Sequence, residues 1–313
     1  MQSTDDNIVI LGTGGTIAGT AADPHDNVGY RAAQVGVEAL VAAVPQLAGL
    51  SLQTEQVAQV DSKDMTHEVW QALALRVDHH LHRSDVRGIV ITHGTDTLEE
   101  TAYFLQRVLA PTKPVVFAAA MRPASSLRPD GPQNLLDAVR VASEAGARGV
   151  VAVLAGEVHG AAEVRKAHTY RTDAFSSGDE GPLAYVEEGR LRVLRAWPEG
   201  EAFGTDGLTR APSAWPRVEI VTSHAGSDGR WVAALAALGA QGVVVAASGN
   251  GSVHQQLEAE LLKLQAAGIR VLRSTRCASG PVLTTGSAVL PSAGLLTPVK
   301  ARVELMLQLM AAG

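Results

Sequence analysis

The chain has 313 residues, of which 46% are hydrophobic and 19% charged, a balance typical of a globular protein and not of a disordered one. Its 26 basic and 32 acidic residues give a formal net charge of −6. This acidic balance does not favour nucleic acid as a binding partner. The length favours two domains, and no apolar run approaches the roughly 20 residues needed to cross a bilayer.

The start of the chain and its cysteine content bear on the cellular compartment. Residues 1–6 contain no positive segment followed by an apolar one, so we do not expect a secretion signal there. Cys277 is the sole cysteine, which excludes an intrachain disulfide and fits a reducing compartment. We therefore expect a cytoplasmic protein, or a periplasmic one if a signal peptide has been removed. Because Cys277 lies near an apolar run, we expect its thiol to be buried and structural.

The first half of the chain alternates short β-branched apolar runs with amphipathic stretches, which predicts a mostly parallel sheet with helices on both faces. The predicted strands are residues 8–11, 88–92, 114–119 and 149–154. The predicted helices are residues 35–44, 98–109 and 132–145. The second of these begins with Thr97 as its expected cap, and Glu99 and Glu100 follow in the first turn, where the helix dipole favours negative charge.

The alternation stops near Glu187. Residues 195–216 carry three Pro, three Gly and scattered charges, which predicts a linker. A second α/β set follows, with strands at 218–221, 242–246 and 269–272 and helices at 230–238, 252–266 and 298–310. We therefore predict two α/β domains: a larger N-terminal domain at 1–194, and a smaller parallel C-terminal domain at 217–313.

Two glycine-rich loops, each with a threonine, directly follow predicted strands. Thr16 follows residues 8–11, and Thr95 with Asp96 follows residues 88–92. In open α/β sheets ligands bind beyond the carboxyl ends of the strands, so these loops indicate a site for a small polar substrate. Two ordinary β–α turns are the alternative for either loop alone. A nucleotide site is disfavoured, because no P-loop lysine is present and Pro24 interrupts the helix that a dinucleotide fold needs.

Hydrolysis by a threonine requires a hydroxyl, a base and N–H donors for the oxyanion. Thr16 and Thr95 supply hydroxyls, the glycine-flanked backbone supplies donors, and a carboxylate at Asp96 can orient a base or bind an ammonium group. A desolvated lysine can serve as the base. The candidates are Lys63, Lys113 and Lys166. Of the three, Lys166 is the most suggestive of a base, although a lysine is more often a solvated surface charge.

The ten histidines do not indicate a metal site. His79, His80 and His82 would spread around a helix axis, and no acidic residue at ligand spacing completes a site. His93, between Thr92 and Gly94, is a candidate catalytic residue, but a hydrogen bond to the turn is the favoured interpretation. We therefore expect no metal site at these histidines.

Together these motifs resemble the bacterial L-asparaginase and glutaminase-asparaginase family, in particular its type II branch. The resemblance runs from Ile8 to Leu309. It rests on the segments Gly14–Gly19, Val35–Val37, Val44–Leu47, Asp61–Met65, Thr92–Thr101, Ala120–Pro123, Asp130–Leu135, Gly249–Gly251 and Lys300–Arg302. The resemblance implies hydrolysis of L-asparagine to L-aspartate and ammonia through a threonine acyl-enzyme, with no metal or cofactor.

The same resemblance implies roles for the reactive residues. Thr16 is the implied nucleophile, and Tyr30 is its activating neighbour on a flexible loop. Thr95, Lys166 and Asp96 match the family's second Thr-Lys-Asp group, which serves proton transfer.

Further matching positions imply how the substrate is bound. Ser62 matches the residue that binds the substrate α-carboxylate, and Asp96 matches the one that binds its α-ammonium. The backbone around Thr16 (including Gly15) and around Thr95 would form the oxyanion hole, and the Ala120 carbonyl would receive the side-chain amide. Family members are typically homotetramers, built as dimers of dimers, in which the small domain completes a neighbour's site.

Three departures from the family pattern concern substrate selectivity. Lys63 stands where many members have Gln, and its position beside Ser62 predicts a contact with the substrate α-carboxylate that favours asparagine over glutamine. Ser252 replaces an Asn that reaches a neighbour's site. The segment Gly280–Gly294 has no acidic residue, so the intersubunit Glu of some members has no counterpart.

Two alternative functions remain: an inactive small-molecule binder with this fold, and an amidotransferase subunit, which would carry an extra N-terminal domain.

Overall fold

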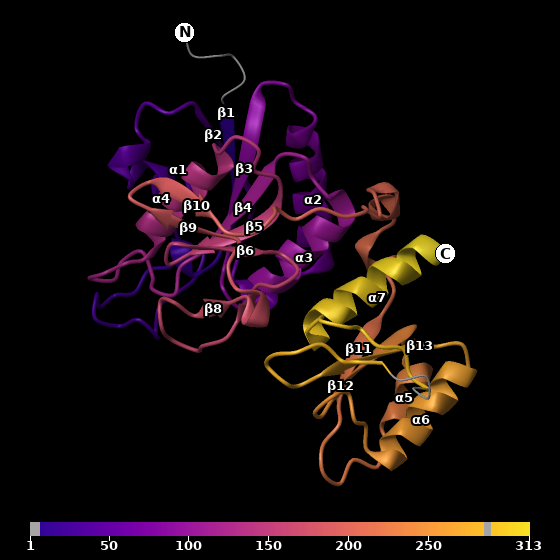
Figure 1. Cartoon of the computed structure of the whole chain (residues 1–313). Helices are drawn as coiled ribbons and strands as arrows, with labels where there is room; N and C mark the ends of the chain where they lie inside the picture. Colours follow the sequence, from indigo (N-terminus) through magenta and orange to yellow (C-terminus); the bar gives the residue numbers. More distant parts are fainter. Residues whose placement is uncertain (1–6, 285–288) are drawn as a thin grey trace. The chain divides into compact units, whose positions relative to one another are not determined.

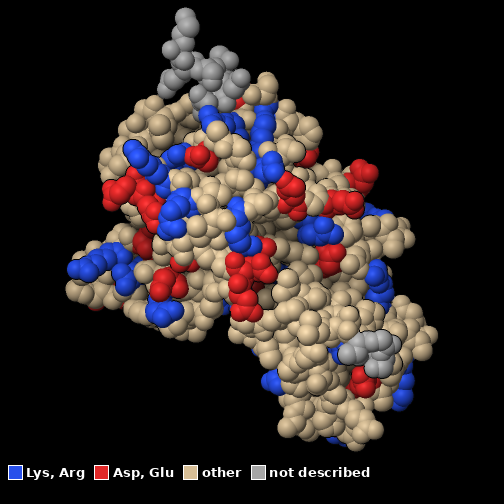
Figure 2. All heavy atoms as spheres, in the orientation of Figure 1, with Lys and Arg blue, Asp and Glu red and all other residues tan. Residues whose placement is uncertain are grey.

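The computed structural model of the chain describes residues 7–284 and 289–313. Two compact α/β units divide between Thr205 and Asp206, inside the segment predicted as a linker (Figure 1). On the visible face of each unit, acidic and basic side chains are interspersed (Figure 2). No helix in the described ranges is long and apolar enough to cross a membrane. The residues on which the signal-peptide prediction depends, 1–6, and part of the Gly280–Gly294 segment, 285–288, lie outside the described residues.

The first unit contains an eight-stranded mixed sheet in the order β10-β9-β6-β5-β4-β3-β1-β2. The strands β1 to β5 run parallel, and β6, β9 and β10 continue the sheet antiparallel. Their bounds are Asn7–Gly14 (β1), Leu52–Val60 (β2), Val86–Thr92 (β3), Pro114–Ala118 (β4), Gly149–Leu154 (β5), Glu157–Gly160 (β6), Ala184–Glu187 (β9) and Arg190–Val193 (β10). A separate pair, β7 (Arg165–Lys166) and β8 (Phe175–Ser176), lies between β6 and β9 in sequence.

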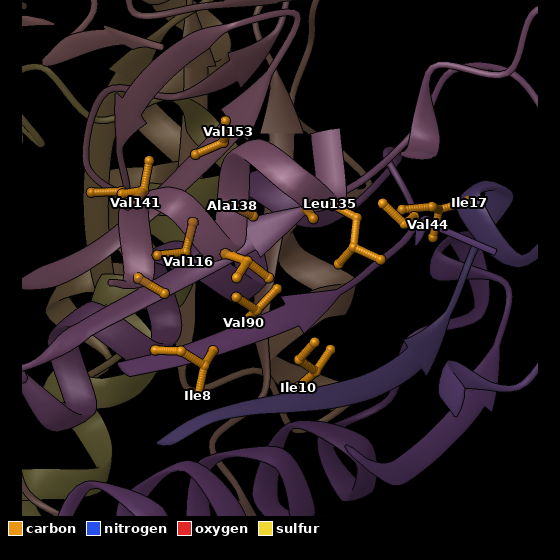
Figure 3. Packing of buried hydrophobic residues seen from close by; sticks show 14 of the residues in the cluster. Ile8, Ile10, Ile17, Val44, Val90, Val116, Leu135, Ala138, Val141 and Val153 are labelled. Carbon is orange, nitrogen blue, oxygen red and sulfur yellow. The ribbon is translucent and has the colours of Figure 1, made fainter. Parts of the chain in front are cut away.

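Helices cover both faces of this sheet, which explains why its central strands carry continuous apolar runs, such as residues 8–11 and 88–91. On one face α4 (Gly131–Ala142) packs Leu135 and Ala138 against alternate residues of the strands, among them Ile10 and Val90, as Figure 3 shows. The helix α1 (Val37–Ala42) joins the same cluster. The intervening strand residues are also fully buried, and α2 (His67–Leu81) and α3 (Leu98–Leu109) cover that second face.

The second unit has a parallel three-stranded sheet in the order β11-β12-β13. These strands are Val218–Thr222, Gly242–Ala247 and Arg270–Thr275, and the helices are α5 (Val232–Ala237), α6 (Gln255–Ala266) and α7 (Pro298–Ala312). Val243, Val245 and Leu261 lie in a single apolar core with α5 and α6. The predicted burial of Cys277 is wrong: β13 ends at Thr275, so the cysteine lies in the loop beyond it and is exposed.

The two-domain α/β prediction is confirmed, but the sequence patterns do not reveal several elements. The strand β2 is half-exposed at the sheet edge and reads as a mixed polar sequence, and β6 to β10 are too short to give a periodic pattern. The helix α2 is also absent from the prediction, although Thr66 caps it by accepting from the Val69 N–H at 3.4 Å. Thr97 is the N-cap residue of α3, as predicted, but it makes no side-chain capping bond, because its hydroxyl donates to the Ser62 carbonyl at 2.8 Å.

Candidate active site

The candidate site lies at the point where the strand order of the large sheet reverses. The chain passes from β1 to its neighbour β2 on one side, and then crosses to β3 on the other side. The carboxyl ends of β1, β2, β3 and β4 lead, respectively, into the loops that carry Thr16, Ser62, Thr95 and Ala120. Such a switch point is where open α/β sheets bind their ligands.

Two glycines allow these loops to touch. Gly15 has a φ of +84°, and a β-carbon placed on it would lie 2.2 Å from the Cα of Gly94. A β-carbon on Gly94 would in turn lie 2.4 Å from the Ser62 Oγ. Any side chain at either glycine would therefore force the loops of Thr16, Ser62 and Thr95 apart.

Thr16 contacts Tyr30. The Thr16 Oγ1 lies 2.6 Å from the Tyr30 hydroxyl oxygen, and the threonine side chain is buried at the start of the short 3-10 turn Thr16–Ala18. Tyr30 reaches it because the intervening loop folds back, with two backbone hydrogen bonds between Thr20 and Arg31 of 2.9 and 2.8 Å. Burial raises the pKa of Tyr30, and the nearby charges of Asp61 and Asp96 raise it further, against the bond from Thr16, which lowers it. The phenol is therefore protonated at neutral pH.

Thr95 contacts a lysine and not a tyrosine. The Lys166 Nζ donates to the Thr95 Oγ1 at 2.9 Å and to the Asp96 Oδ1 at 2.6 Å. The lysine side chain is only 20% exposed. An ammonium group donates and cannot accept, so the hydrogen of the Thr95 hydroxyl points away from Lys166. The Lys166 main chain is held as well, since its N–H donates to the Glu99 Oε1 at 3.3 Å.

Ser62 ties its own loop, which follows β2, to the loop that carries Thr95 and Asp96. Its Oγ accepts from the Asp96 N–H at 3.1 Å, and its carbonyl accepts from the Thr97 hydroxyl at 2.8 Å. The serine lies on the 3-10 turn Ser62–Asp64, which Asp61 caps by accepting from the Lys63 N–H. Because the Ser62 oxygen already accepts, its own hydrogen can be donated to an anionic ligand.

Lys63 and Lys113 do not contact the threonines. The Lys63 side chain is 60% exposed, and its Nζ pairs with Asp64 and lies 3.7 Å from the Asp61 Oδ2. The Lys113 Nζ donates to the Arg83 carbonyl at 2.7 Å. Of the three lysines considered as a base, Lys166 alone reaches a threonine hydroxyl, and the contact of Lys63 with a substrate carboxylate stays a prediction.

Three further predicted positions lie in different surroundings. Ala120 is fully buried just beyond β4. Ser252 belongs to the second unit, where it exchanges backbone hydrogen bonds with Ser248. His93 is also fully buried, with its Nδ1 2.7 Å from the Gly94 carbonyl, which confirms the prediction that it bonds the turn. Burial lowers its pKa to about 4, so it is neutral at physiological pH.

No group of three or more His, Cys, Asp or Glu in the described ranges is arranged to hold a metal ion. The three neighbouring histidines, two on α2 and His82 just beyond its end, face different surroundings. His80 is buried with its Nε2 2.9 Å from the Glu55 Oε2, whereas His82 is exposed.

Two contacts around the site are not predicted by the sequence. Glu99 is expected only to complement the helix dipole, whereas it also accepts from the Lys166 main chain. Asp130 stands out only as part of a motif, whereas its carboxylate accepts from the N–H groups of Met121 and Arg122 at 2.9 and 3.0 Å and fixes the loop after Ala120. The position of Asp130 just before a predicted helix is the one sequence feature that indicates its contact with these N–H groups.

Family models cover nearly the whole chain. The model described as Asparaginase, N-terminal, matches residues 7–199, and the model described as Glutaminase/Asparaginase C-terminal domain matches residues 217–312.

Individual relatives agree with the family models. The chain is 38% identical to L-asparaginase 2 of Escherichia coli, over 97% of this chain and 88% of that protein. It is 38% identical to a glutaminase-asparaginase of Pseudomonas fluorescens biotype A, over 88% of this chain and 76% of that protein. The crystal structure of a probable cytoplasmic L-asparaginase from Campylobacter jejuni matches with a TM-score of 0.91 and 37% identity, over 97% of this chain and 95% of that one.

Proposed function

The chain belongs to the asparaginase family and is an L-asparaginase, and from this premise we propose that it hydrolyses L-asparagine to L-aspartate and ammonia through an acyl-enzyme on Thr16. One observation carries this proposal: two threonine hydroxyls lie at the switch point of the sheet, each with a different polar partner. Tyr30 is 2.6 Å from Thr16, and Lys166 is 2.9 Å from Thr95. The proposed reaction uses no metal and no cofactor.

In the first half-reaction the Thr16 Oγ1 attacks the side-chain amide carbon, and the C–N bond breaks. The proton of Thr16 passes to the Tyr30 oxygen while the phenolic proton of Tyr30 passes to the departing nitrogen. Burial raises the pKa of Tyr30, so this residue acts as a protonated relay and not as a standing base. Ammonia leaves, and an ester between Thr16 and the aspartyl group remains.

In the second half-reaction a water attacks that ester. The Thr95 oxygen accepts from the Lys166 Nζ, so its remaining hydrogen is available to orient the water. The hydroxyl of the water adds to the acyl carbon, and its proton returns to the Thr16 oxygen as the ester bond breaks. In both steps N–H groups around Gly15, Thr16 and Thr95 would stabilise the oxyanion, a contribution of several kcal/mol in similar sites.

The substrate's α-groups are bound by the loop that follows β2 and the loop that follows β3. The Ser62 hydroxyl donates to the α-carboxylate, and the Asp96 carboxylate accepts from the α-ammonium while it also pairs with Lys166. The Ala120 carbonyl receives the side-chain amide. Lys63 is a further candidate for the α-carboxylate, if its ammonium leaves Asp61 and Asp64.

The domain roles and the assembly are also part of this proposal. Residues 1–194 carry the reactive groups, residues 195–216 connect them to residues 217–313, and the latter complete a neighbour's site through Ser252 in a homotetramer. We propose a cytoplasmic location, by similarity to the Campylobacter relative. Cell fractionation tests this location against the periplasm.

The direct test is release of ammonia from L-asparagine and from L-glutamine by the purified full chain. We expect turnover of asparagine and weaker or no turnover of glutamine. A chain that binds asparagine by calorimetry but releases no ammonia would be a small-molecule binder with an asparaginase fold, and the proposal would fail.

A further inference from the structure

Lys166, which reaches both Thr95 and Asp96, lies outside the large sheet. It is on β7, a two-residue strand whose partner β8 is also two residues long, in the excursion between β6 and β9. Lys166 pairs directly with Phe175, and Figure 1 shows β8 on a loop outside the eight-stranded sheet. So short a ladder has few hydrogen bonds of its own, and its position must depend on contacts with the rest of the fold.

A buried side-chain contact joins this excursion to the large sheet. Ser177 follows β8 immediately, and its Oγ lies 2.9 Å from the Nδ1 of His159 on β6. Both side chains are buried, that of His159 to within 1% exposure. On the other side of the ring the His159 Nε2 lies 3.6 Å from the Glu157 Oε2.

The chemistry of these groups orients the contact. A carboxylate at Glu157 can only accept, which favours a hydrogen on the Nε2 that faces it, and Nδ1 can then accept from the Ser177 hydroxyl. His159 is itself held by the sheet, because its strand pairs with β5 opposite Ala152. The strand β6, which belongs to the rigid sheet, therefore holds β8, and β8 is the partner of the strand β7 that carries Lys166.

We propose that His159 and Ser177 are positioning residues for the amide hydrolysis: their hydrogen bond anchors the β7–β8 pair and so holds the Lys166 Nζ against Thr95 and Asp96. This inference rests on the role proposed above for Lys166. The contacts to be held are 2.9 Å and 2.6 Å long, and a displacement of about 1 Å costs up to about 100-fold in rate in comparable sites. Gly15, Thr16 and Ser62 lie on loops of the large sheet, which this hydrogen bond does not hold.

The experiment compares two neighbouring serines. Ser177→Ala removes the anchor, whereas Ser176→Ala removes a hydroxyl that only accepts from the Gly178 N–H at 3.0 Å. In Ser177→Ala we expect kcat for asparagine to fall by about tenfold, with KM changed by less than about threefold. Ser176→Ala should retain the wild-type kcat. Equal kcat values in the two variants, or a change in KM alone, would overturn the proposal.

A second pair of variants tests the imidazole through rescue. His159→Asn keeps a polar group near the position of Nδ1, whereas His159→Leu keeps volume and removes the hydrogen bond. We expect His159→Asn to recover most of the kcat that His159→Leu loses. Equal losses would mean that packing, and not the hydrogen bond, is what matters.

Amide hydrogen exchange, which does not depend on catalysis, separates this inference from the proposed function. The N–H groups of Ala167 and His168 both donate to the Ala174 carbonyl within the excursion, at 2.7 and 3.0 Å. Their hydrogen exchange should be faster in Ser177→Ala than in Ser176→Ala, and equal exchange would refute the anchor whatever the activity. An active Lys166→Met variant would instead refute the role of the lysine.

Discussion

The two threonine hydroxyls at the site differ in what they touch, and the roles proposed for them follow from this difference. Thr16 faces a protonated phenol, whereas Thr95 accepts from an ammonium group. Both side chains lie on loops that glycines bring together, so removing either hydroxyl should leave the packing of the sheet unchanged.

We therefore expect Thr16→Ala and Thr95→Ala each to lower asparagine turnover by several orders of magnitude without loss of folded structure. The measurement is kcat by ammonia release, with circular dichroism to check the fold. Thr16→Ser keeps the hydroxyl and should retain part of the activity. A Thr→Ala variant with more than about a tenth of wild-type turnover would remove that threonine from the mechanism.

Lys166 and Lys113 form a matched pair for testing the lysine. Lys166→Met removes the donor to Thr95 and Asp96, and we expect at least about a 100-fold loss in kcat. Lys113→Met removes a bond to the Arg83 carbonyl, and its kcat should remain within about twofold of wild type. Comparable losses in both variants would show that the effect of Lys166 is not specific to the site.

Lys63 tests substrate choice. Its ammonium is directed to Asp61 and Asp64, so the contact with the substrate that the sequence predicts requires it to leave these carboxylates. Discrimination against one extra methylene is usually about 10–200-fold, and we expect asparagine to be preferred within this range. If the ammonium stays with the carboxylates, the ratio of kcat/KM for asparagine and glutamine will be the same in wild type and Lys63→Gln. A lower ratio in Lys63→Gln would show that the lysine sets selectivity.

The residues brought together at the site are predictable from the sequence to different degrees. Thr16, Thr95 and Asp96 directly follow apolar strands, so their place at one sheet edge follows from parallel topology. Tyr30 is assigned through the family resemblance alone. Lys166 is one of three candidate lysines before the resemblance is considered, and nothing local indicates which threonine it reaches. The contact of Lys166 with Glu99 spans 67 residues of sequence and joins a two-residue strand to a helix, so no periodic pattern could predict it.

At the scale of elements, an ionic cluster joins the edge strand β2 to α2. Glu55 on β2 accepts from the Arg76 Nε and Nη2 at 2.6 and 2.8 Å, and the buried His80 lies 2.9 Å from the same carboxylate. Arg76 holds the pKa of Glu55 down at about 2, and burial lowers the pKa of His80 below its ordinary value. Since β2 leads to Ser62, this cluster holds the strand that precedes one loop of the site.

Both shifts make the free energy of unfolding fall as the pH falls. The unfolded chain binds protons on His80 below about pH 6.5 and on Glu55 below about pH 4.5, whereas the folded chain resists both. We expect Glu55→Gln to destabilise the protein by about 1 kcal/mol at pH 7. The free energy of unfolding of this variant should also fall less steeply than that of the wild type between about pH 4.5 and pH 2. Urea unfolding at several pH values measures this.

The control for this effect is Glu219→Gln. Glu219 pairs with Arg217 at the surface at 2.6 Å, and such exposed pairs contribute little to stability. Its unfolding free energy should follow the wild-type pH profile. A Glu55→Gln profile parallel to wild type below pH 4.5 would refute the role of this cluster.

The elements themselves are predictable where burial is complete. The strand β4 is apolar at every position and β3 is apolar from Gly88 to Ile91, because helices cover both faces of the sheet, and their sequences show it. The edge strand β2 and the short strands β6 to β10 are partly exposed or too brief, so tertiary pairing defines them and local sequence does not.

At the scale of the whole molecule, the reactive groups described above all lie in the first unit, whereas Ser252 lies in the second. The family resemblance implies that the second unit serves a neighbouring copy. We therefore expect a homotetramer by light scattering, with activity that is lost in a monomeric form. An active monomer at assay concentration would contradict this prediction.

A shared site also predicts complementation between two inactive chains. Thr16→Ala removes the proposed nucleophile, and Ser252→Trp fills the place where the second unit is expected to approach a neighbour's substrate. If Ser252 serves the neighbouring copy, hybrids refolded from both variants contain some sites with Thr16 from one chain and Ser252 from the other. Such hybrids should regain part of the wild-type activity, while each variant refolded alone should stay inactive, because every site then carries the same defect. Full activity of Ser252→Trp alone would show that this face of the second unit does not approach the substrate.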